Sequence, residues 1–208
     1  MEKQVNKSHY QFDKYFTKRR WISIWHQLDE VFKVNPKSVL EIGPGPGVFN
    51  KILKDNKIKV DTVDIDPELK PDFVASATEL PFLDNSYDCV CAFQVLEHLP
   101  YKDSLKAFNE FVRVAKFNVI ISLPDAKVLY HYSIHVPKFR ILKFNIPKPT
   151  LGKKVHEFKG QHYWEINKRG YSIKKIKTDF NVVNVRLLKS YRVWEHPYHH
   201  YFIFKKEE

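Results

Sequence analysis

The sequence predicts an α/β fold, with a seven-stranded, mostly parallel sheet, helices on both faces and an antiparallel last strand. Short apolar runs alternate with longer amphipathic segments up to residue 123, which is the pattern of parallel strands joined by helices. The first apolar run reaches an acidic residue and then a turn of three glycines alternating with two prolines (VLEIGPGPG, residues 39–47). Such a turn after a first strand is typical of open α/β sheets, which bind ligands at the carboxyl ends of their strands.

The elements of the cofactor-side half can be placed in order. Two helices precede the sheet, and they carry many aromatic side chains. Strands and helices then alternate. The predicted helices are 6–17, 19–33, 46–55 and 102–115, and the predicted strands are 37–42, 58–63, 72–75, 87–92 and 118–123.

The regular alternation stops after residue 123. Residues 124–160 contain four prolines, which exclude long helices. A helix ending at Arg169 and closed by Gly170 is expected next, followed by a short basic helix from a Ser172 cap to residue 180. Residues 182–188 and 198–204 predict strands six and seven, which form an antiparallel hairpin.

The glycine turn indicates the kind of ligand. Glycine allows a close backbone approach and positive φ. The spacing at residues 43, 45 and 47 does not match the G-x-G-x-x-G of dinucleotide-binding folds, and the two prolines remove N–H groups that a pyrophosphate would need. Glu41 would repel a phosphate and attract a cation. S-adenosylmethionine has no phosphate and carries an ammonium and a sulfonium, so it is the expected cofactor.

Residues 37–124 resemble a class I S-adenosylmethionine-dependent methyltransferase of the type 11-like group, whose sheet is Rossmann-like. The turn matches the family's first motif, 60–66 its second strand, 75–82 its adenine-side loop, and 87–92 with 95–99 its fourth strand and the segment after it. Asp64 lies 21 residues after Gly43, the spacing of a ribose-binding acid. The resemblance implies these cofactor-binding residues: Glu41, Gly43, Gly45, Gly47, Asp64, Ile65, Ser76, Ala77, Thr78, Phe93 and Gln94.

The resemblance also implies a domain organisation and one departure from it. Residues 1–208 are expected to form one methyltransferase domain, with an N-terminal helical lid (1–35), a cofactor-binding core (36–123), a substrate-side insertion (124–165) and a C-terminal helix and strand hairpin (166–208). Tyr15, Arg20 and Trp21 are lid candidates, although aromatic side chains that form the core face of a helix would give the same pattern. The family usually has an acid where this chain has Ser76, so a weaker contact with the adenine amino group is expected.

Histidines are the candidate catalytic residues. His98 follows the fourth strand, where the methyl group should point, and His162 lies in a segment dense in polar and aromatic groups; His156 is a further candidate. No metal site is expected. His131 and His135 would share a face if residues 131–135 were helical, and residues 196–200 hold three more histidines. Neither pattern has a zinc-type cysteine spacing or a carboxylate partner, so surface or packed histidines are expected.

Charge is distributed unevenly along the chain. Residues 1–124 carry 17 basic and 17 acidic side chains, whereas residues 125–208 carry 18 basic and 7 acidic ones. A basic surface fits a phosphorylated or acidic substrate or a polyanion, and a solvated face gives the same signal. No oligomeric state is predicted.

The remaining sequence features concern the cellular location of the protein. No apolar run is long enough to span a membrane, and the polar start (MEKQ) does not resemble a signal peptide. Cys89 and Cys91 are two residues apart on a predicted buried strand, so they are expected to be free core thiols in a reducing compartment. The expected location is cytoplasmic.

Three functions remain open from the sequence. The first is methylation of a small molecule or glycan precursor at oxygen, which the expected enclosed pocket after strand five favours. The second is methylation of RNA along the basic C-terminal half. The third is a non-catalytic binding module on the same fold.

Overall fold

The computed structural model describes residues 7–138, 141–149, 152 and 154–207. Its helices and strands, in chain order, are η1 (Lys7–Tyr10), α1 (Phe12–Tyr15), α2 (Lys18–Val34), β1 (Ser38–Ile42), α3 (Val48–Asp55), β2 (Lys59–Asp64), η2 (Pro67–Leu69), β3 (Phe73–Val74), β4 (Tyr87–Phe93), η3 (Leu96–His98), α4 (Tyr101–Val114), β5 (Ala115–Pro124), β6 (Leu129–His135), β7 (Ile141–Pro147), α5 (Ile173–Asp179), β8 (Val185–Arg192) and β9 (His199–Lys206).

A seven-stranded sheet forms the centre of the molecule. Its strand order is β3-β2-β1-β4-β5-β9-β8. The first five strands in that order are parallel to one another, whereas β9 runs antiparallel to both β5 and β8. The predicted sheet, its antiparallel last strand and the terminal hairpin are therefore confirmed.

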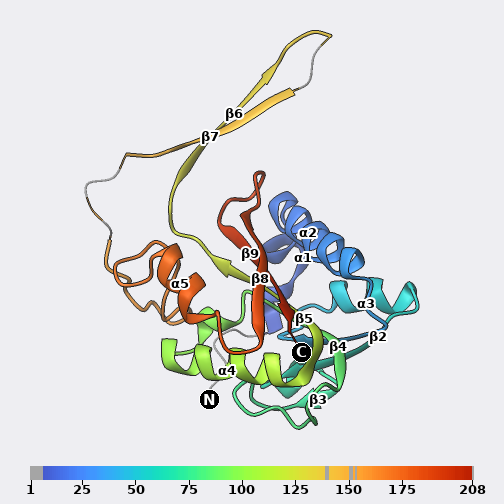
Figure 1. Cartoon of the computed structure of the whole chain (residues 1–208). Coiled ribbons are helices and arrows are strands. Elements are labelled where there is room, and N and C mark those ends of the chain that lie inside the picture. Colours follow the sequence, from blue (N-terminus) through green and yellow to red (C-terminus); the bar gives the residue numbers. More distant parts are fainter. Residues whose placement is uncertain (1–6, 139–140, 150–151, 153, 208) are drawn as a thin grey trace.

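Helices cover both faces of this sheet (Figure 1). On one face, α2 and α3 pack over a core that contains Val31, Phe49 and Leu53. On the other face, α4 and α5 pack over a larger core, in which Phe108 of α4 and Phe180, the C-cap of α5, are fully buried. Because strand side chains alternate between faces, buried apolar residues on both sides are expected of a parallel sheet in this position. The α/β fold class is confirmed.

The N-terminal helices differ from the prediction. Residue 6 lies outside the described residues, and the single helix expected over 6–17 is two short pieces, η1 and α1, separated at Gln11. Tyr10 and Tyr15 both approach Gly45. In one straight helix these two side chains would point about 140° apart, so the break lets both rings reach the same turn. The second helix, α2, agrees with the prediction, but Trp21 and Trp25 are exposed rather than core-facing.

The helix expected to end at Arg169 is absent from the described residues. Residues 160–170 form bends and turns, with Ile166 in a parallel bridge to Asp125. Trp164 and Ile166 are both fully buried, and Trp164 Nε1 donates to Ser104 Oγ at 2.9 Å. Alternate burial of this kind suits extended chain, which explains why the helical prediction was wrong.

The proline-containing segment after β5 does avoid helix, but it forms a hairpin. Strands β6 and β7 pair antiparallel and project away from the body of the domain (Figure 1). His131 and His135 lie in β6, so their Cα atoms are about 13 Å apart along the strand. The helical arrangement considered for this histidine pair was wrong.

The two cysteines are free and buried, as predicted. Their Sγ atoms lie 3.7 Å apart on β4. Burial strongly raises the pKa of Cys91, which keeps the thiol protonated. Within the described residues, no helix combines the length and the apolar composition needed to cross a membrane.

Candidate active site

The glycine turn joins β1 to α3 at the carboxyl edge of the sheet. All three glycines have positive φ, +70° at Gly43, +52° at Gly45 and +75° at Gly47, a conformation that other residues adopt only with strain. The N–H of Gly43 donates to the carbonyl of Val63 at 2.8 Å, which ties the turn to the end of β2. A Cβ on Gly43 would lie 2.6 Å from Val95 Cγ2. Glycine therefore suits this turn because of the positive φ at all three positions and because a side chain at position 43 would clash with Val95.

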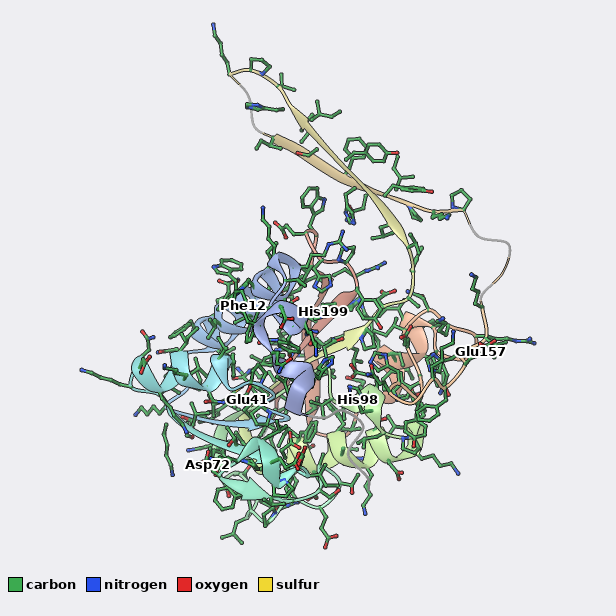
Figure 2. The ribbon with its side chains drawn as sticks, turned by 180° about the vertical axis from the view of Figure 1, so that it is seen from behind. Phe12, Glu41, Asp72, His98, Glu157 and His199 are labelled. Carbon is green, nitrogen blue, oxygen red and sulfur yellow. The ribbon has the colours of Figure 1, made fainter. Side chains whose placement is uncertain are left out.

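Glu41 lies one residue before the end of β1 and is buried. Asn50 Nδ2, from α3, donates to Glu41 Oε2 at 2.9 Å. Burial raises the pKa of Glu41 to about 8, and the donor from Asn50 opposes that shift. Figure 2 shows Glu41 inside the body of the domain, away from the projecting hairpin. A bound cation at this place would favour the ionised carboxylate, in agreement with the expected ammonium or sulfonium ligand.

Asp64 ends β2, the strand beside β1, so it lies on the same sheet edge as the turn. Asp64 Oδ1 accepts from the N–H of Asp66 at 2.9 Å. Burial raises the pKa of Asp64. Asp66 caps η2 by accepting from Glu68 N at 3.0 Å, directly before Pro67. Ile65 connects the two acids at the strand end.

The adenine-side loop follows β3. Ser76 Oγ lies 2.8 Å from Thr78 Oγ1 and accepts from the N–H of Thr78 at 3.3 Å. Ala77 packs against the core on the α4 side. The Ser76 hydroxyl is thus already engaged within its own loop, which agrees with the weaker ligand contact expected when serine replaces an acid here.

Phe93 ends β4, the strand beside β1, and Gln94 follows it directly. The Phe93 ring packs against Phe49 (centroids 5.1 Å apart) and Tyr201 (6.1 Å), so this side chain belongs to the core on the α2–α3 side. Gln94 has φ of +57°, and its Nε2 donates to Ser122 Oγ at 3.2 Å. Strained backbone of this kind concentrates at functional sites. Because its side chain is packed in the core, Phe93 can contact a ligand only through its backbone. The Gln94 side chain is fixed at the end of β4 by its hydrogen bond to Ser122.

The N-terminal segment lies against the glycine turn. The Tyr10 ring comes within 3.2 Å, and the Tyr15 hydroxyl within 3.8 Å, of the position that a Cβ on Gly45 would take. Burial raises the pKa of Tyr10 to about 12. Arg20 stacks over the Tyr15 ring at 4.4 Å, whereas Trp21 remains 44% exposed and packs on Phe16. Two of the three lid candidates, Tyr15 and Arg20, thus come near the turn.

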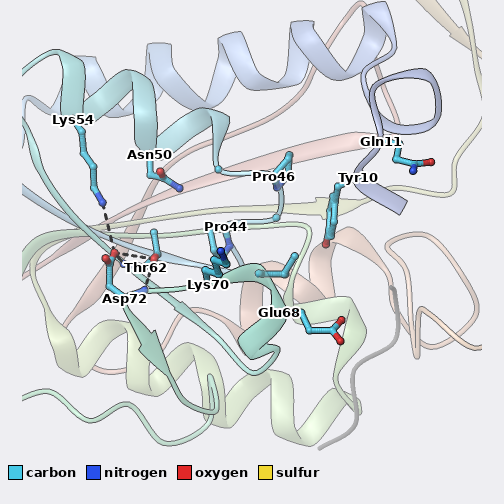
Figure 3. A pocket seen from close by; sticks show the side chains of 13 residues that line it. Tyr10, Gln11, Pro44, Pro46, Asn50, Lys54, Thr62, Glu68, Lys70 and Asp72 are labelled. Carbon is cyan, nitrogen blue, oxygen red and sulfur yellow. Dashed lines mark hydrogen bonds and ion pairs between the residues drawn. The ribbon is translucent and has the colours of Figure 1, made fainter. Parts of the chain in front are cut away.

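A cavity of about 730 Å³ opens beside this turn (Figure 3). Figure 3 shows Tyr10 from the N-terminal segment on one side of it and Asn50 of α3 on another. Lys54 and Asp72 form an ion pair at 3.6 Å in its wall. The cavity is lined by Tyr10, Gln11, Pro44, Gly45, Pro46, Gly47, Asn50, Lys54, Thr62, Glu68, Leu69, Lys70 and Asp72.

The structure brings together the two catalytic candidates, which are far apart in the chain. His98 ends η3 after β4, and His162 comes from the segment after the hairpin; their ring centroids are 4.9 Å apart. Burial and the neighbouring His162 lower the pKa of His98 to about 4. Despite burial, the hydrogen bond to Glu165 raises the pKa of His162. His98 is therefore a weak base at neutral pH, and His162 is the stronger of the pair.

A second cavity, of about 750 Å³, lies beside His162. Three lysines face it, from positions 154, 159 and 168. His156, the third candidate base, also lines it, and its Nε2 is hydrogen-bonded to the carbonyl of His162 at 2.7 Å. The remaining lining residues are Val155, Glu157, Gln161, His162, Glu165 and Tyr198. A volume of this size suits a small ligand, and the lysines suit an acidic one.

The C-terminal histidines have structural partners. Ser23 Oγ lies 3.0 Å from His196 Nδ1 and 2.9 Å from His199 Nδ1, and His199 is buried. His200 lies 3.2 Å from the buried Asp125 Oδ2. These contacts join α2 and β5 to the last strand, and they agree with the packed histidines expected for residues 196–200.

The cofactor-side half of the chain is similar to known proteins. Residues 40–123 match the family model described as a methyltransferase domain. The structure of 1,6-didemethyltoxoflavin-N1-methyltransferase from Burkholderia thailandensis, with bound 1,6-didemethyltoxoflavin and S-adenosylhomocysteine, is similar with a TM-score of 0.64 at 12% identity, over 97% of this chain and 85% of that one. Residues 40–123 therefore match a methyltransferase domain, and the chain shares the fold of solved S-adenosylmethionine-dependent methyltransferases.

The chain is also similar to an uncharacterised protein and to an enzyme with another reaction. An uncharacterised protein of Methanocaldococcus jannaschii is 31% identical over 126 residues, which are 52% of this chain and 55% of that protein. The match thus spans about half the length of this relative. The 4+2 cyclase SpnF shares the fold with a TM-score of 0.57 at 12% identity, over 88% of this chain and 80% of that one. A methyltransferase-like fold by itself therefore does not define the reaction.

The residues of the methyltransferase domain fit S-adenosylmethionine. Gly45 and Gly47 line the cavity beside the turn without side chains, and Glu41 and Asp64 stand near the ends of neighbouring strands. Sequence reasoning did not find Tyr10, Glu165 or Tyr198 as site residues. Tyr10 could have been found only by its proximity in the fold, since the aromatic-rich N-terminus offered many equivalent candidates.

Proposed function

We propose that this chain transfers a methyl group from S-adenosylmethionine to an oxygen atom of an acidic or phosphorylated small molecule or glycan precursor. The observation that carries the proposal is the lysine-lined cavity of about 750 Å³ beside His162, since a cavity of this size suits a small ligand. Bound S-adenosylmethionine supplies an electrophilic methyl group. The chain binds and orients the two reactants, excludes water and assists loss of the acceptor's proton.

Named residues divide these tasks in the proposal. Glu41, Asp64 and the glycines of the turn hold the cofactor, with Ser76 and Gln94 on either side. The N-terminal segment, through Tyr10 and Tyr15, covers the turn as a lid. His98 and His162 are the candidates for handling the acceptor's proton. The two buried free thiols agree with a cytoplasmic, reducing location.

The alternative acceptor is RNA, which the 18 basic and 7 acidic side chains of residues 125–208 favour. The experiment is transfer of labelled methyl from S-adenosylmethionine into a cell extract, with and without ribonuclease. Label in a small soluble or glycan fraction that survives ribonuclease supports the proposal, whereas label lost on treatment supports RNA. An RNA substrate would also lose affinity steeply with salt.

The same assay tests a third possibility, a non-catalytic module. The variant Asp64→Ala provides a control without the expected ribose contact, so label must disappear with it. Absence of label from wild type, together with absence of S-adenosylhomocysteine binding, would refute the enzymatic proposal.

A further inference from the structure

One side-chain cluster next to the domain's catalytic candidates has the composition of a metal site. Glu97, His98 and His162 place one potential ligand atom each within 4.8 Å of the others. Ligands at about 2.1 Å from one cation lie about 3 to 3.5 Å apart, so a small inward movement of these side chains would complete a site. Among the described residues, this is the one group of three or more such side chains found.

Glu97 is the most unusual member. It is fully buried, and neither carboxylate oxygen has a hydrogen-bond partner among the described residues. Removing a carboxylate from water without a partner is costly, so the fold has placed here a group that needs a proton or a cation. Burial raises the pKa of Glu97 to about 7, and His162 opposes that shift.

Both imidazoles are oriented by hydrogen bonds on the same ring atom. His98 Nδ1 lies 3.0 Å from the carbonyl oxygen of Gln161. A carbonyl only accepts, so this nitrogen carries the hydrogen and Nε2 keeps its lone pair. His162 Nδ1 lies 2.9 Å from Glu165 Oε1. This contact favours the same tautomer in His162, with the lone pair on Nε2 when the imidazole is neutral.

The contact between His162 and Glu165 is the pattern found behind metal-bound histidines, where a carboxylate holds the ring and raises its basicity. Glu165 is itself held, since it accepts from the Tyr198 hydroxyl at 2.8 Å. His98 is supported in the same way, with the backbone carbonyl of Gln161 in place of a carboxylate. Ligand atoms and their supporting groups are therefore both present in the cluster.

We propose that Glu97, His98 and His162 bind one divalent transition-metal ion beside the cofactor site. Two imidazoles and one carboxylate suit Zn²⁺ or Mn²⁺ better than Mg²⁺ or Ca²⁺, which prefer oxygen ligands. Three protein ligands leave coordination positions open. Because His162 also lines the lysine-containing cavity, the ion would lie next to the space assigned to the acceptor.

This inference rests on the proposed function for its chemistry. The metal-bound acceptor hydroxyl loses its proton to solvent, because the cation lowers the pKa of that hydroxyl. Its oxygen forms the bond to the methyl carbon, and the electron pair of the broken C–S bond stays on sulfur as neutral S-adenosylhomocysteine. Imidazoles that bind the metal through Nε2 cannot also take the proton, so the ion replaces them as the activating group.

The test is isothermal titration of the full chain, stripped with EDTA, with ZnCl₂, MnCl₂ and MgCl₂ in turn. We expect one equivalent of Zn²⁺ or Mn²⁺ to bind, with Mg²⁺ at least tenfold weaker. Glu97→Gln and His162→Gln should each lose at least tenfold in affinity. His131→Gln is the matched control, because His131 is exposed on β6 and contacts Asn145, and it should bind like wild type.

Failure of the metal site and failure of the methyltransferase proposal give different results. Glu97→Gln keeps the shape of the side chain and removes a buried charge, and its circular dichroism and binding of S-adenosylhomocysteine should match wild type. Absence of Zn²⁺ and Mn²⁺ binding by a wild-type chain that binds S-adenosylhomocysteine would overturn the metal site. Equal affinity in Glu97→Gln would overturn it as well. Metal binding without S-adenosylhomocysteine binding would leave the site standing and refute the proposed function.

Discussion

The substitution Gly43→Ala tests whether glycine is needed at position 43 because of its positive φ, because a Cβ would clash with Val95, or for both reasons. At φ of +70° a residue with a Cβ costs about 1–2 kcal/mol of folding free energy. The new Cβ would also meet Val95 Cγ2 at 2.6 Å. Overpacking of that kind typically costs about 1–3 kcal/mol. Alanine returns about 0.4–1 kcal/mol by restricting the unfolded chain. The expected loss of stability is about 1–5 kcal/mol.

Gly170→Ala is the matched control. Gly170 has φ of +87°, and a Cβ there would meet nothing within 4 Å. It therefore carries the conformational cost and the unfolded-state gain without the clash. The free energy of unfolding of each variant is measured by urea denaturation, and Gly43→Ala should lose about 1–3 kcal/mol more than Gly170→Ala.

A double-mutant cycle assigns the difference to its cause. In a Val95→Ala background the clash disappears, so the cost of Gly43→Ala should fall to that of Gly170→Ala. The reasoning is refuted if the two glycine variants lose the same stability, or if Val95→Ala leaves the cost of Gly43→Ala unchanged. In either result, crowding at Val95 would not be what requires glycine at position 43.

Three other side chains give predictions of the same kind. Asp64→Asn should weaken S-adenosylhomocysteine binding at least tenfold in calorimetry. Asp55→Asn, at the exposed end of α3, should leave the affinity unchanged. Equal losses of affinity in the two variants would contradict a ribose contact by Asp64. The pKa of Glu41 is about 8 in the folded protein and near 4.5 when unfolded, so its contribution to stability is complete below about pH 4.5 and is lost as pH rises through 8. Urea midpoints across this range should fall less steeply in Glu41→Gln, and an unaltered slope would contradict the assignment. Trp164→Phe removes the donor to Ser104 Oγ and should cost about 1–3 kcal/mol in urea denaturation; a wild-type midpoint would show that this hydrogen bond contributes no net stability.

The strands and turns on the cofactor side of the domain could be predicted from sequence because short, continuous segments specify them. The run from Glu41 to Gly47 specifies a strand end, a turn and a helix start within a few residues. Asp64 follows at a spacing set by one helix and one strand. The parallel sheet then places both segments on one edge, as the register of β1 with β2 shows.

Predictions failed where local patterns had more than one solution. Residues 6–17 have helical composition, yet Tyr10 and Tyr15 contact one turn only because the helix is broken. The segment before Gly170 carries a helix-ending signal, but burial of Trp164 and Ile166 holds it extended. In both segments tertiary contacts outweighed helix propensity, which is a weak preference for each residue.

The sequence alone determined the fold class and the cofactor, and it predicted candidate cofactor-binding residues, because each depends on short segments with fixed spacing. Only the tertiary structure brought His98 and His162 together across 64 residues of chain and placed the buried carboxylate of Glu97 within 4.8 Å of their ring nitrogens. The reason is physical. Burial of Trp164 and Ile166 in the core fixes the chain around His162, so the partners of that side chain are decided by the fold and not by its neighbours in sequence.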